Sequence, residues 1–138
     1  MVDVHNKAIR SLNMSRIRSK NTKPEMIVRK YLFKNGYRFR LHDMKLPGKP
    51  DLVLPKYKTI IFVHGCFWHG HKGCRFAVIP ATRTEWWKNK ITRTKLIDLQ
   101  NKIKLEESGW RIITIYECEL KKNKIISTFN FLTETLKK

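Results

Sequence analysis

The stretch VHGCFWHGHKGC, residues 63–74, constrains the fold of this chain more than any other feature. It continues the apolar run TIIF and places three histidines and two cysteines, the usual zinc ligands, within twelve residues. The bulky aromatics Phe67 and Trp68 stand among them, although aromatic side chains are mostly buried in cores. The fold must therefore present a polar loop with metal-ligand chemistry at the end of a buried strand.

Cys66, His71 and Cys74 have the spacing C-x4-H-x2-C, which supplies three of the four ligands of a structural zinc site. Cys118, the remaining cysteine, follows the apolar segment WRIITIYE and completes a closed site if two strand ends meet. Zinc would then tie the loop to the sheet. An alternative set takes His69 as the fourth ligand, with all four in one loop, and leaves Cys118 as a buried small side chain.

Residues 22–138 carry the pattern of a single α/β domain with one core. A helix is predicted for TKPEMIVRKYLFKNG, because Thr22 suits the N-cap, proline the first turn and glycine the end. Strands are predicted for YRFRL, DLVL, TIIFVH and WRIITIYE. TIIFVH is apolar nearly throughout and should be central and covered on both faces, and WRIITIYE should also be internal.

Two further helices complete the pattern. One is predicted over residues 84–107, with Leu96, Leu99 and Ile103 on its buried side. The C-terminal segment should form a helix packed on the sheet, because its apolar residues recur at helical spacing, namely Ile125, Phe129, Leu132 and Leu136. A hairpin followed by a helical crossover predicts a mixed sheet with helices on its faces.

The charge of the chain indicates a polyanionic partner. Thirty Lys and Arg against eleven Asp and Glu give a formal net charge of +19 over 138 residues. Such a surplus repels itself in the compact state, and nucleic acid offsets it because each neutralised phosphate releases a counterion. Residues 1–21 are polar and basic and are predicted to form a DNA-contacting arm, with Met14 and Ile17 as apolar contacts. The alternative for this segment is a short helix docked on the domain.

The expected location is the cytoplasm, with association to the nucleoid when the protein acts on DNA. No secretory signal, lipidation signal or long apolar run is evident, so we expect no membrane partner. Three cysteines cannot all pair within one chain, and thiols stay reduced in the cytoplasm. Metal ligation or burial is therefore expected for the cysteines.

Candidate catalytic groups stand close to the histidine-rich loop. Asp51 heads the strand DLVL and His64 ends TIIFVH thirteen residues later, so a hairpin can bring them opposite each other. A magnesium-dependent nuclease needs hard oxygen ligands, a base or water-orienting group, and a cation near the scissile phosphate. Asp51 offers the first, and His64 and His69 offer the other two. Taken alone, Asp51 is better explained as a turn aspartate after Pro50, and His64 has the alternative of a hydrogen-bonded strand-end histidine.

These residues resemble those of a known nuclease family. The PD before an apolar strand resembles the first half of the PD-(D/E)xK nuclease signature, but Phe62 and His64 stand where that signature has an acid and a lysine. The blocks DVHNKAIRSLNM, LPGKPDLVL, IIFVHGCFWHGH, PATRTEWW and GWRIITIYEC resemble, in order, those of the very short patch repair endonucleases. The resemblance covers about residues 2–120.

The resemblance implies a restriction-endonuclease-like α/β fold, in which helices flank a mixed central sheet and zinc plays a structural part. It implies a DNA endonuclease that nicks one strand of duplex DNA beside a thymine mispaired with guanine, a mispair left by deamination of 5-methylcytosine. The implied cofactors are catalytic Mg²⁺ and structural Zn²⁺. We expect a monomer, with mismatch-repair proteins as candidate partners.

The resemblance also implies roles for single residues. Asp51 would hold magnesium by its carboxylate, and residue 63, often threonine in the family and Val63 here, would add a backbone carbonyl. His64 and His69 map onto active-site histidines, and Glu25 onto an additional acidic residue. Glu25 also has capping-box spacing, which gives it a structural alternative. The implied zinc ligands are Cys66, His71, Cys74 and Cys118.

A DNA wedge explains the aromatics of the loop better than burial in the core does. DNA-binding proteins insert apolar side chains between base steps, at a cost of roughly a few kcal/mol per step. A mispair opens more easily, which is itself a source of selectivity. The resemblance implies an intercalating set of Phe67, Trp68 and Trp87, with Trp86 as the alternative third member. His69 would take a proton from the attacking water or orient it, leaving a 5′ phosphate and a 3′ hydroxyl.

Two other classes of protein fit the same residues. One is a sequence-specific restriction or mobile-element nuclease on the same scaffold. The other is a zinc-stabilised nucleic-acid-binding protein without catalysis. Comparing a thymine–guanine duplex with its fully paired version, in magnesium, separates the first from a mismatch endonuclease, and any magnesium-dependent nicking excludes the second.

Overall fold

The computed structural model describes residues 22–138, so the predicted arm of residues 1–21, with Met14 and Ile17, lies outside the described residues. The first described helix begins as predicted, because the hydroxyl of Thr22 accepts the backbone N–H of Glu25 at 3.4 Å. The α-helices are α2 (Lys23–Lys34), α3 (Thr84–Glu107) and α4 (Ile125–Leu136). The strands are β1 (Arg40–Leu41), β2 (Leu52–Leu54), β3 (Thr59–His64) and β4 (Arg111–Tyr116).

The four strands form one mixed sheet in the order β1-β2-β3-β4. β2 and β3 pair as the predicted antiparallel hairpin, and β3 pairs in parallel with β4 from Thr59↔Arg111 to His64↔Tyr116. The central position predicted for β3 is confirmed. The expectation that β4 is internal is wrong, because it lies at an edge of this sheet. Its apolar character reflects the helices that cover Ile113 and Ile115 rather than a second neighbouring strand.

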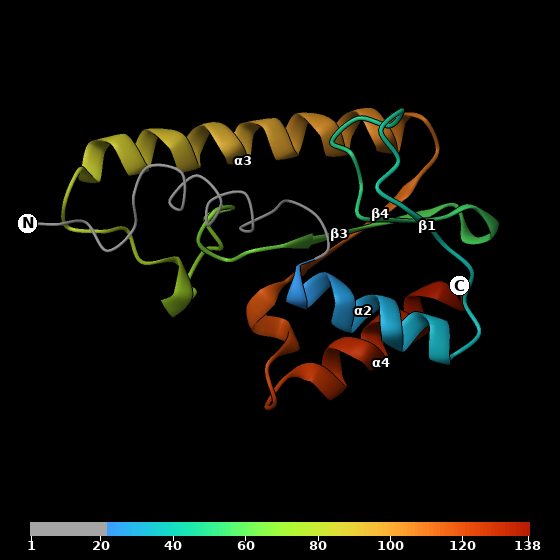
Figure 1. Ribbon diagram of the computed structural model, residues 1–138. Coiled ribbons are helices and arrows are strands. Elements are labelled where there is room, and N and C mark those ends of the chain that lie inside the picture. Colours follow the sequence, from blue (N-terminus) through green and yellow to red (C-terminus); the bar gives the residue numbers. More distant parts are fainter. Residues whose placement is uncertain (1–21) are drawn as a thin grey trace, which may run out of the picture.

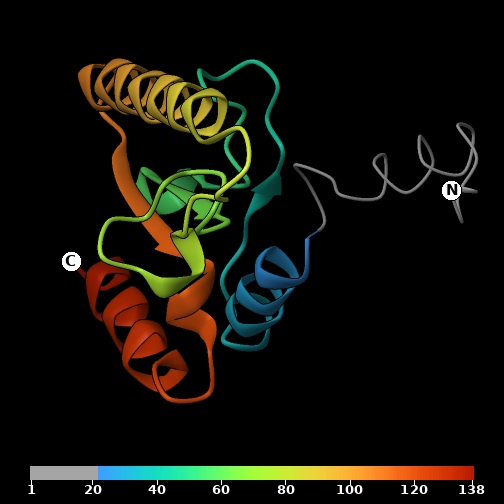
Figure 2. The ribbon, with the colours of Figure 1, turned by 90° about the vertical axis from the view of Figure 1, so that its left-hand side faces the viewer.

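Helices cover both faces of the sheet, as predicted (Figure 1). On one face α2 and α4 pack through Val28, Leu32 and Leu132, which confirms the apolar stripe predicted for the C-terminal helix. On the other face lies α3, and Figure 2 shows the sheet between these two layers. Between residues 22 and 138, none of the helices combines the length and the apolar character that crossing a membrane would require.

The buried side predicted for α3 is wrong. Leu96, Leu99 and Ile103 are 55%, 53% and 45% exposed. The buried apolar residues of α3 are Ile91, near its start, and Leu105, near its end, which packs on the sheet. The helix is therefore anchored towards its two ends, and its middle turns span a cleft instead of resting on the core.

Candidate active site and metal centre

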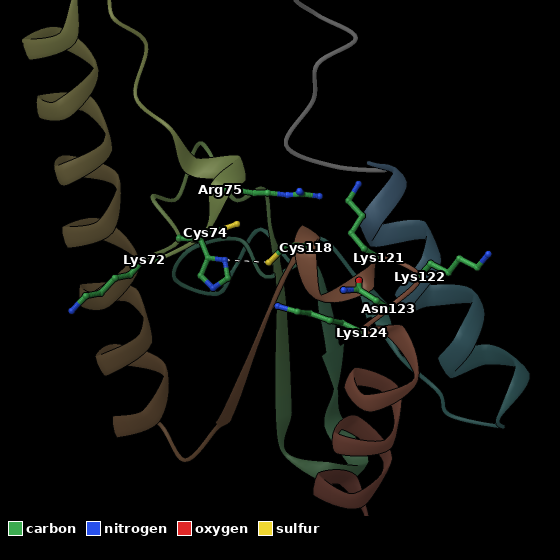
Figure 3. A pocket seen from close by; sticks show the side chains of 10 residues that line it. Lys72, Cys74, Arg75, Cys118, Lys121, Lys122, Asn123 and Lys124 are labelled. Atoms are coloured by element: carbon green, nitrogen blue, oxygen red, sulfur yellow. Dashed lines mark hydrogen bonds between the residues drawn. The ribbon is translucent and has the colours of Figure 1, made fainter.

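Three cysteines and one histidine gather beyond the C-terminal ends of β3 and β4. Parallel strands end at the same edge of a sheet, so Cys66, just after β3, meets Cys118, just after β4. The backbone N–H of Cys118 donates to Cys66 Sγ at 3.3 Å, and Cys118 Sγ lies 3.3 Å from His71 Nδ1. Figure 3 shows the Cys74 and Cys118 side chains near each other and marks the contact to Cys118 with a dashed line. We call these four residues the thiolate cluster: Cys66, His71, Cys74 and Cys118.

The thiolate cluster is compatible with zinc. One ligand atom from each residue lies within 4.8 Å of every other, and three sulfurs with one nitrogen are a usual tetrahedral zinc set. Burial raises the pKa of the Cys66 and Cys118 thiols. That of Cys118 rises to about 12, with the neighbouring thiols of Cys66 and Cys74 contributing, whereas hydrogen bonds from Cys118 oppose the rise at Cys66. A cation reverses this, because a coordinating thiol is deprotonated outright. The structure brings Cys118 to the cluster, whereas His69 lies in another group.

The loop between the strand and the thiolate cluster is held closely against α3. A Cβ on Gly70 would lie 2.5 Å from Ile91 Cγ2, and Gly70 has a φ of +58°, so glycine is needed there for both space and backbone conformation. The backbone N–H of His71 donates to the carbonyl of Cys66 at 2.9 Å. The His71 ring also stacks on Tyr116, with centroids 3.9 Å apart. These contacts fix the position of Phe67, Trp68 and His69 in the loop.

On the β2 side of β3, Glu25, His42 and Asp51 form what we call the carboxylate cluster. One ligand atom from each lies within 4.8 Å of the others. Asp51 Oδ2 accepts the backbone N–H of Val63 at 2.7 Å, and His42 Nε2 lies 2.8 Å from Glu25 Oε2. Glu25 is 1% exposed and Asp51 is 8% exposed. Asp51 therefore sits beside Val63, and Glu25 sits beside Asp51.

The electrostatics of the carboxylate cluster suit a hard cation. Burial raises the pKa of Asp51 to about 7; the N–H of Val63 opposes this shift, while the negative charge of Glu25 adds to it. Two carboxylates buried together are costly when both are ionised, and Arg29 Nη1, 3.4 Å from Glu25 Oε2, sets one positive charge against the two. A divalent cation with a preference for oxygen ligands removes that cost, so Asp51 and Glu25 fit the magnesium site expected from the sequence.

The histidines expected to be catalytic lie side by side. The rings of His64 and His69 stack with centroids 3.7 Å apart, and His69 Nδ1 lies 2.7 Å from Asp98 Oδ2 on α3. Burial and the nearby His69 lower the pKa of His64 to about 4, so His64 is neutral at pH 7. Within residues 22–138, His64 Nδ1 is a buried nitrogen with no hydrogen-bond partner.

One cleft of about 920 Å³ connects these groups. Its floor includes the end of β3, and the middle turns of α3 form a wall, which is why Leu99 is not buried in the core. Its lining includes Asp51, His64 and His69 together with Trp68, His42 and Asp98. The cleft thus brings together residues that the sequence analysis proposed separately for hydrolysis and for DNA distortion.

The aromatic residues of the loop cluster with one tryptophan of α3. The ring centroids of Phe67, Trp68 and Trp87 are separated by 5.1 to 5.7 Å. Trp68 is 42% exposed, so this aromatic cluster is not sealed in the interior. Trp86 is 44% exposed and contacts Trp87 and the Arg83 guanidinium, 4.7 Å from its ring centroid, but no ring contact joins it to Phe67 or Trp68 among the described residues. The geometry therefore favours Trp87 over Trp86 as the third member of the set.

Two site residues, His42 and Asp98, were not identified from the sequence. Asp98 is the only acidic residue between Trp86 and Leu105 in a strongly basic helix, and that isolation was an available signal. His42 follows β1 directly and carries no spacing signal. Its φ of 47° lies in the left-handed region, which histidine adopts more readily than most residues.

A buried carboxylate pair, a histidine–aspartate pair and an aromatic cluster around one cleft suit metal-assisted phosphodiester hydrolysis, the chemistry of a nuclease. The family model for the DNA mismatch endonuclease Vsr matches residues 2–75. The type II nicking enzyme V.NmeAIP of Neisseria meningitidis is 48% identical over 126 residues, 91% of this chain and 89% of that protein. The DNA mismatch endonuclease Vsr of Escherichia coli K12 is 43% identical over 136 residues, 99% of this chain and 86% of that protein.

The chain belongs to the Vsr DNA mismatch endonuclease family, and it is a DNA endonuclease. The family resemblance drawn from the sequence blocks is thereby confirmed, and the alternative of a non-catalytic binding protein is wrong. The relatives are named both as mismatch endonucleases and as nicking enzymes. Membership of the family therefore establishes the class of reaction, cleavage of DNA, more firmly than the feature of the DNA that the enzyme recognises.

Proposed function

We propose that this endonuclease nicks one strand of duplex DNA beside a thymine mispaired with guanine, with Mg²⁺ at Asp51 and Zn²⁺ in the thiolate cluster. One observation carries the proposal: Trp68 of the aromatic cluster lines the same cleft as Asp51 and His69. A wedge that opens a base step at Trp68 therefore delivers a phosphodiester to the hydrolytic groups. The mixed sheet with helices on both faces supports a restriction-endonuclease-like fold for residues 22–138.

Asp51 and the Val63 carbonyl would hold the catalytic cation. In an extended strand the N–H and C=O of one residue face the same neighbour, and the Val63 N–H already bonds to Asp51. Glu25 adds negative charge to the same pocket. A divalent cation there neutralises charge on the scissile phosphate and on the leaving 3′ oxygen.

His69 would act as the general base. Its hydrogen bond to Asp98 assigns the ring proton to Nδ1 and leaves the lone pair on Nε2 for the proton of an attacking water. Asp98 holds the ring in place and stabilises the imidazolium that forms. Neutral His64 stacks on His69 and offers a ring nitrogen to the phosphate or to the water.

Zinc in the thiolate cluster would be structural. Four protein ligands leave no open position for a substrate, whereas a catalytic zinc keeps one. The ion would bind Cys66 and Cys118 at two strand ends and His71 and Cys74 in the loop. The same loop carries both the wedge and His69. Rigid zinc ligation would therefore fix the distance between the opened base-pair step of the DNA and the imidazole that activates water.

Positive charge near the site supports a DNA substrate. A hollow of about 1170 Å³ beside the thiolate cluster is rimmed by basic residues of the loop and of the segment before α4 (Figure 3). Arg75 and Lys121 extend towards the same space there, and Lys124 lies below them. We expect these cations, with the basic arm of residues 1–21, to contact phosphates of a duplex bound by a monomeric enzyme in the cytoplasm. Mismatch-repair proteins stay candidate partners.

The decisive experiment compares duplexes that differ only at one base pair. In Mg²⁺, we expect nicking of the thymine strand in a thymine–guanine duplex and none, or at least roughly 100-fold less, in the thymine–adenine duplex. Products mapped on both strands identify the nicked bond. Equal cleavage of both duplexes at a fixed sequence would instead establish the sequence-specific alternative, which the nicking-enzyme relatives make the second candidate.

A pair of substitutions tests the wedge. Trp87→Ala should lower mismatch nicking at least roughly tenfold, because stacked aromatics contribute about 1–3 kcal/mol per base. Trp86→Ala removes a neighbouring tryptophan of the same helix and should change the rate by less than threefold or so. The opposite ranking would make Trp86 the third wedge residue.

A further inference from the structure

His42 is the member of the carboxylate cluster to which neither the sequence pattern nor the family resemblance gives a role. It follows β1, and its backbone N–H donates to the carbonyl of Asp51 at 3.1 Å. Its Nε2 lies 2.8 Å from Glu25 Oε2, and the side chain lines the cleft beside Asp51. Its left-handed backbone, with a φ of 47°, turns the chain at this point. Left-handed histidines persist where the surroundings fix them, commonly at functional sites.

We propose that His42 Nε2 is a ligand of the cation bound by Asp51 and Glu25, and that this nitrogen makes the site prefer Mn²⁺ to Mg²⁺. The inference rests on the proposed function, because it concerns the same cation site. It adds a ligand and a metal preference to that site.

The spacing of the donor atoms fits one ion. Around an octahedral cation with bonds of about 2.1 Å, adjacent ligand atoms are roughly 3 Å apart and opposite ones roughly 4.2 Å apart. The 2.8 Å between His42 Nε2 and Glu25 Oε2 matches an adjacent pair, and all three ligand atoms lie within 4.8 Å of one another. Without an ion, Glu25 Oε2 is hydrogen-bonded to His42 Nε2 and also accepts from Arg29 Nη1 at 3.4 Å.

The donor types set the metal preference. Carboxylate and carbonyl oxygens suit Mg²⁺ and Mn²⁺ alike, but imidazole nitrogen favours transition-metal ions. Mg²⁺ also gives up its water reluctantly and is usually bound by one or two carboxylates without nitrogen. An Asp–Glu–His set with two buried carboxylates and a half-buried imidazole is therefore expected to hold Mn²⁺ more tightly, while Mg²⁺ at higher concentration still supports the reaction.

The test titrates Mn²⁺ into the zinc-loaded enzyme and follows free Mn²⁺ by electron paramagnetic resonance, with Mg²⁺ competition giving the affinity ratio. His42→Gln should weaken Mn²⁺ binding at least roughly tenfold and change Mg²⁺ affinity by less than about threefold. Bound Mn²⁺ should show nitrogen hyperfine coupling in the wild type but not in His42→Gln. His69→Gln, which removes an imidazole from the same cleft but outside the cluster, should keep the coupling.

If His42 only oriented Glu25 by a hydrogen bond, the result would be different. The amide of His42→Gln still donates to Glu25, so unchanged Mn²⁺ affinity and unchanged hyperfine coupling in that variant would overturn the proposal. His42→Asn, which tolerates the left-handed backbone, repeats the test if the glutamine variant melts early. If Asp51→Asn also leaves Mn²⁺ binding unchanged and Mg²⁺-dependent nicking is absent, the proposed function itself fails. If nicking requires Asp51 but His42→Gln retains Mn²⁺, only the ligand assignment fails.

Discussion

The thiolate cluster and the carboxylate cluster flank the same end of β3, yet they differ in closure and in donor type. The thiolate cluster has four donors from a loop and the end of a strand, enough to surround a tetrahedral ion completely. The carboxylate cluster has three donors, from α2, the residue after β1 and the residue before β2, and it opens on the cleft. Closed sulfur-rich coordination suits a structural ion, and open oxygen-rich coordination suits a reacting one.

The largest effect should come from removing one ligand of the closed thiolate cluster. Cys118→Ser replaces a thiolate ligand by a hydroxyl, so zinc content should fall from one per chain to near zero. We expect a loss of at least ~4 kcal/mol in the free energy of unfolding and no measurable nicking, because the loop loses its tie to the sheet. Metal analysis and thermal unfolding measure both effects. Full zinc content with an unchanged melting temperature would show that Cys118 is not a zinc ligand.

A substitution in the open carboxylate cluster should instead lower the reaction rate and leave the zinc content unchanged. Asp51→Ala should lower the nicking rate by on the order of 10³-fold or more, because the cation loses its main ligand. Binding of the thymine–guanine duplex should stay within roughly threefold, and the zinc content should not change. Single-turnover nicking and a binding titration on the same preparation separate the two quantities. Equal losses of binding and rate would argue against a metal role for Asp51.

The histidine–aspartate pair lies between the two clusters and should show an intermediate effect. Asp98→Asn keeps the shape of the side chain but no longer fixes the ring proton of His69 on Nδ1, so we expect a roughly 100-fold lower turnover with little change in DNA binding. Glu107→Gln removes an exposed carboxylate from the same helix and serves as the control. A rate loss shared by both variants would point to lost charge on α3 instead.

The smallest effect is on stability and depends on pH. The folded pKa of Asp51, about 7, lies above its ordinary value of 3.8, so the folded state holds the extra proton in that window. Its contribution to stability is present at low pH and is lost as pH rises from about 4 to about 7. In metal-free buffer at pH 8, Asp51→Asn should therefore melt about 5 °C higher than the wild type, and no higher at pH 4.

His64 does not disturb this comparison. Its pKa is lowered to about 4 from 6.5, so its contribution to stability is lost as pH falls through that window, in both proteins alike. Added Mg²⁺ should raise the melting temperature of the wild type and not that of Asp51→Asn. A difference in melting temperature that does not change with pH would show that burial does not destabilise the ionised form of Asp51.

Local patterns in the sequence predicted much of this protein. The cap at Thr22, the hairpin of β2 and β3, the central place of β3 and the stripe of α4 all follow from spacings of a few residues, and the structure confirms them. Three members of the thiolate cluster were also available, because they lie within nine residues, whereas the sequence left Cys118 and His69 as alternatives for the fourth. Such features depend on backbone periodicity and on the chemistry of nearby side chains, both of which can be recognised within a short stretch of sequence.

Tertiary structure alone decided which side chains meet across the cleft. His69 pairs with Asp98 at a separation of 29 residues, and Glu25 with His42 at a separation of 17, so no local pattern links them. The apolar stripe predicted for α3 failed for a related reason: helical periodicity marks a face, but only packing determines whether a core lies beneath it. Here the helix bridges a cleft, and the residues on its middle turns form the wall of the site instead of the interior.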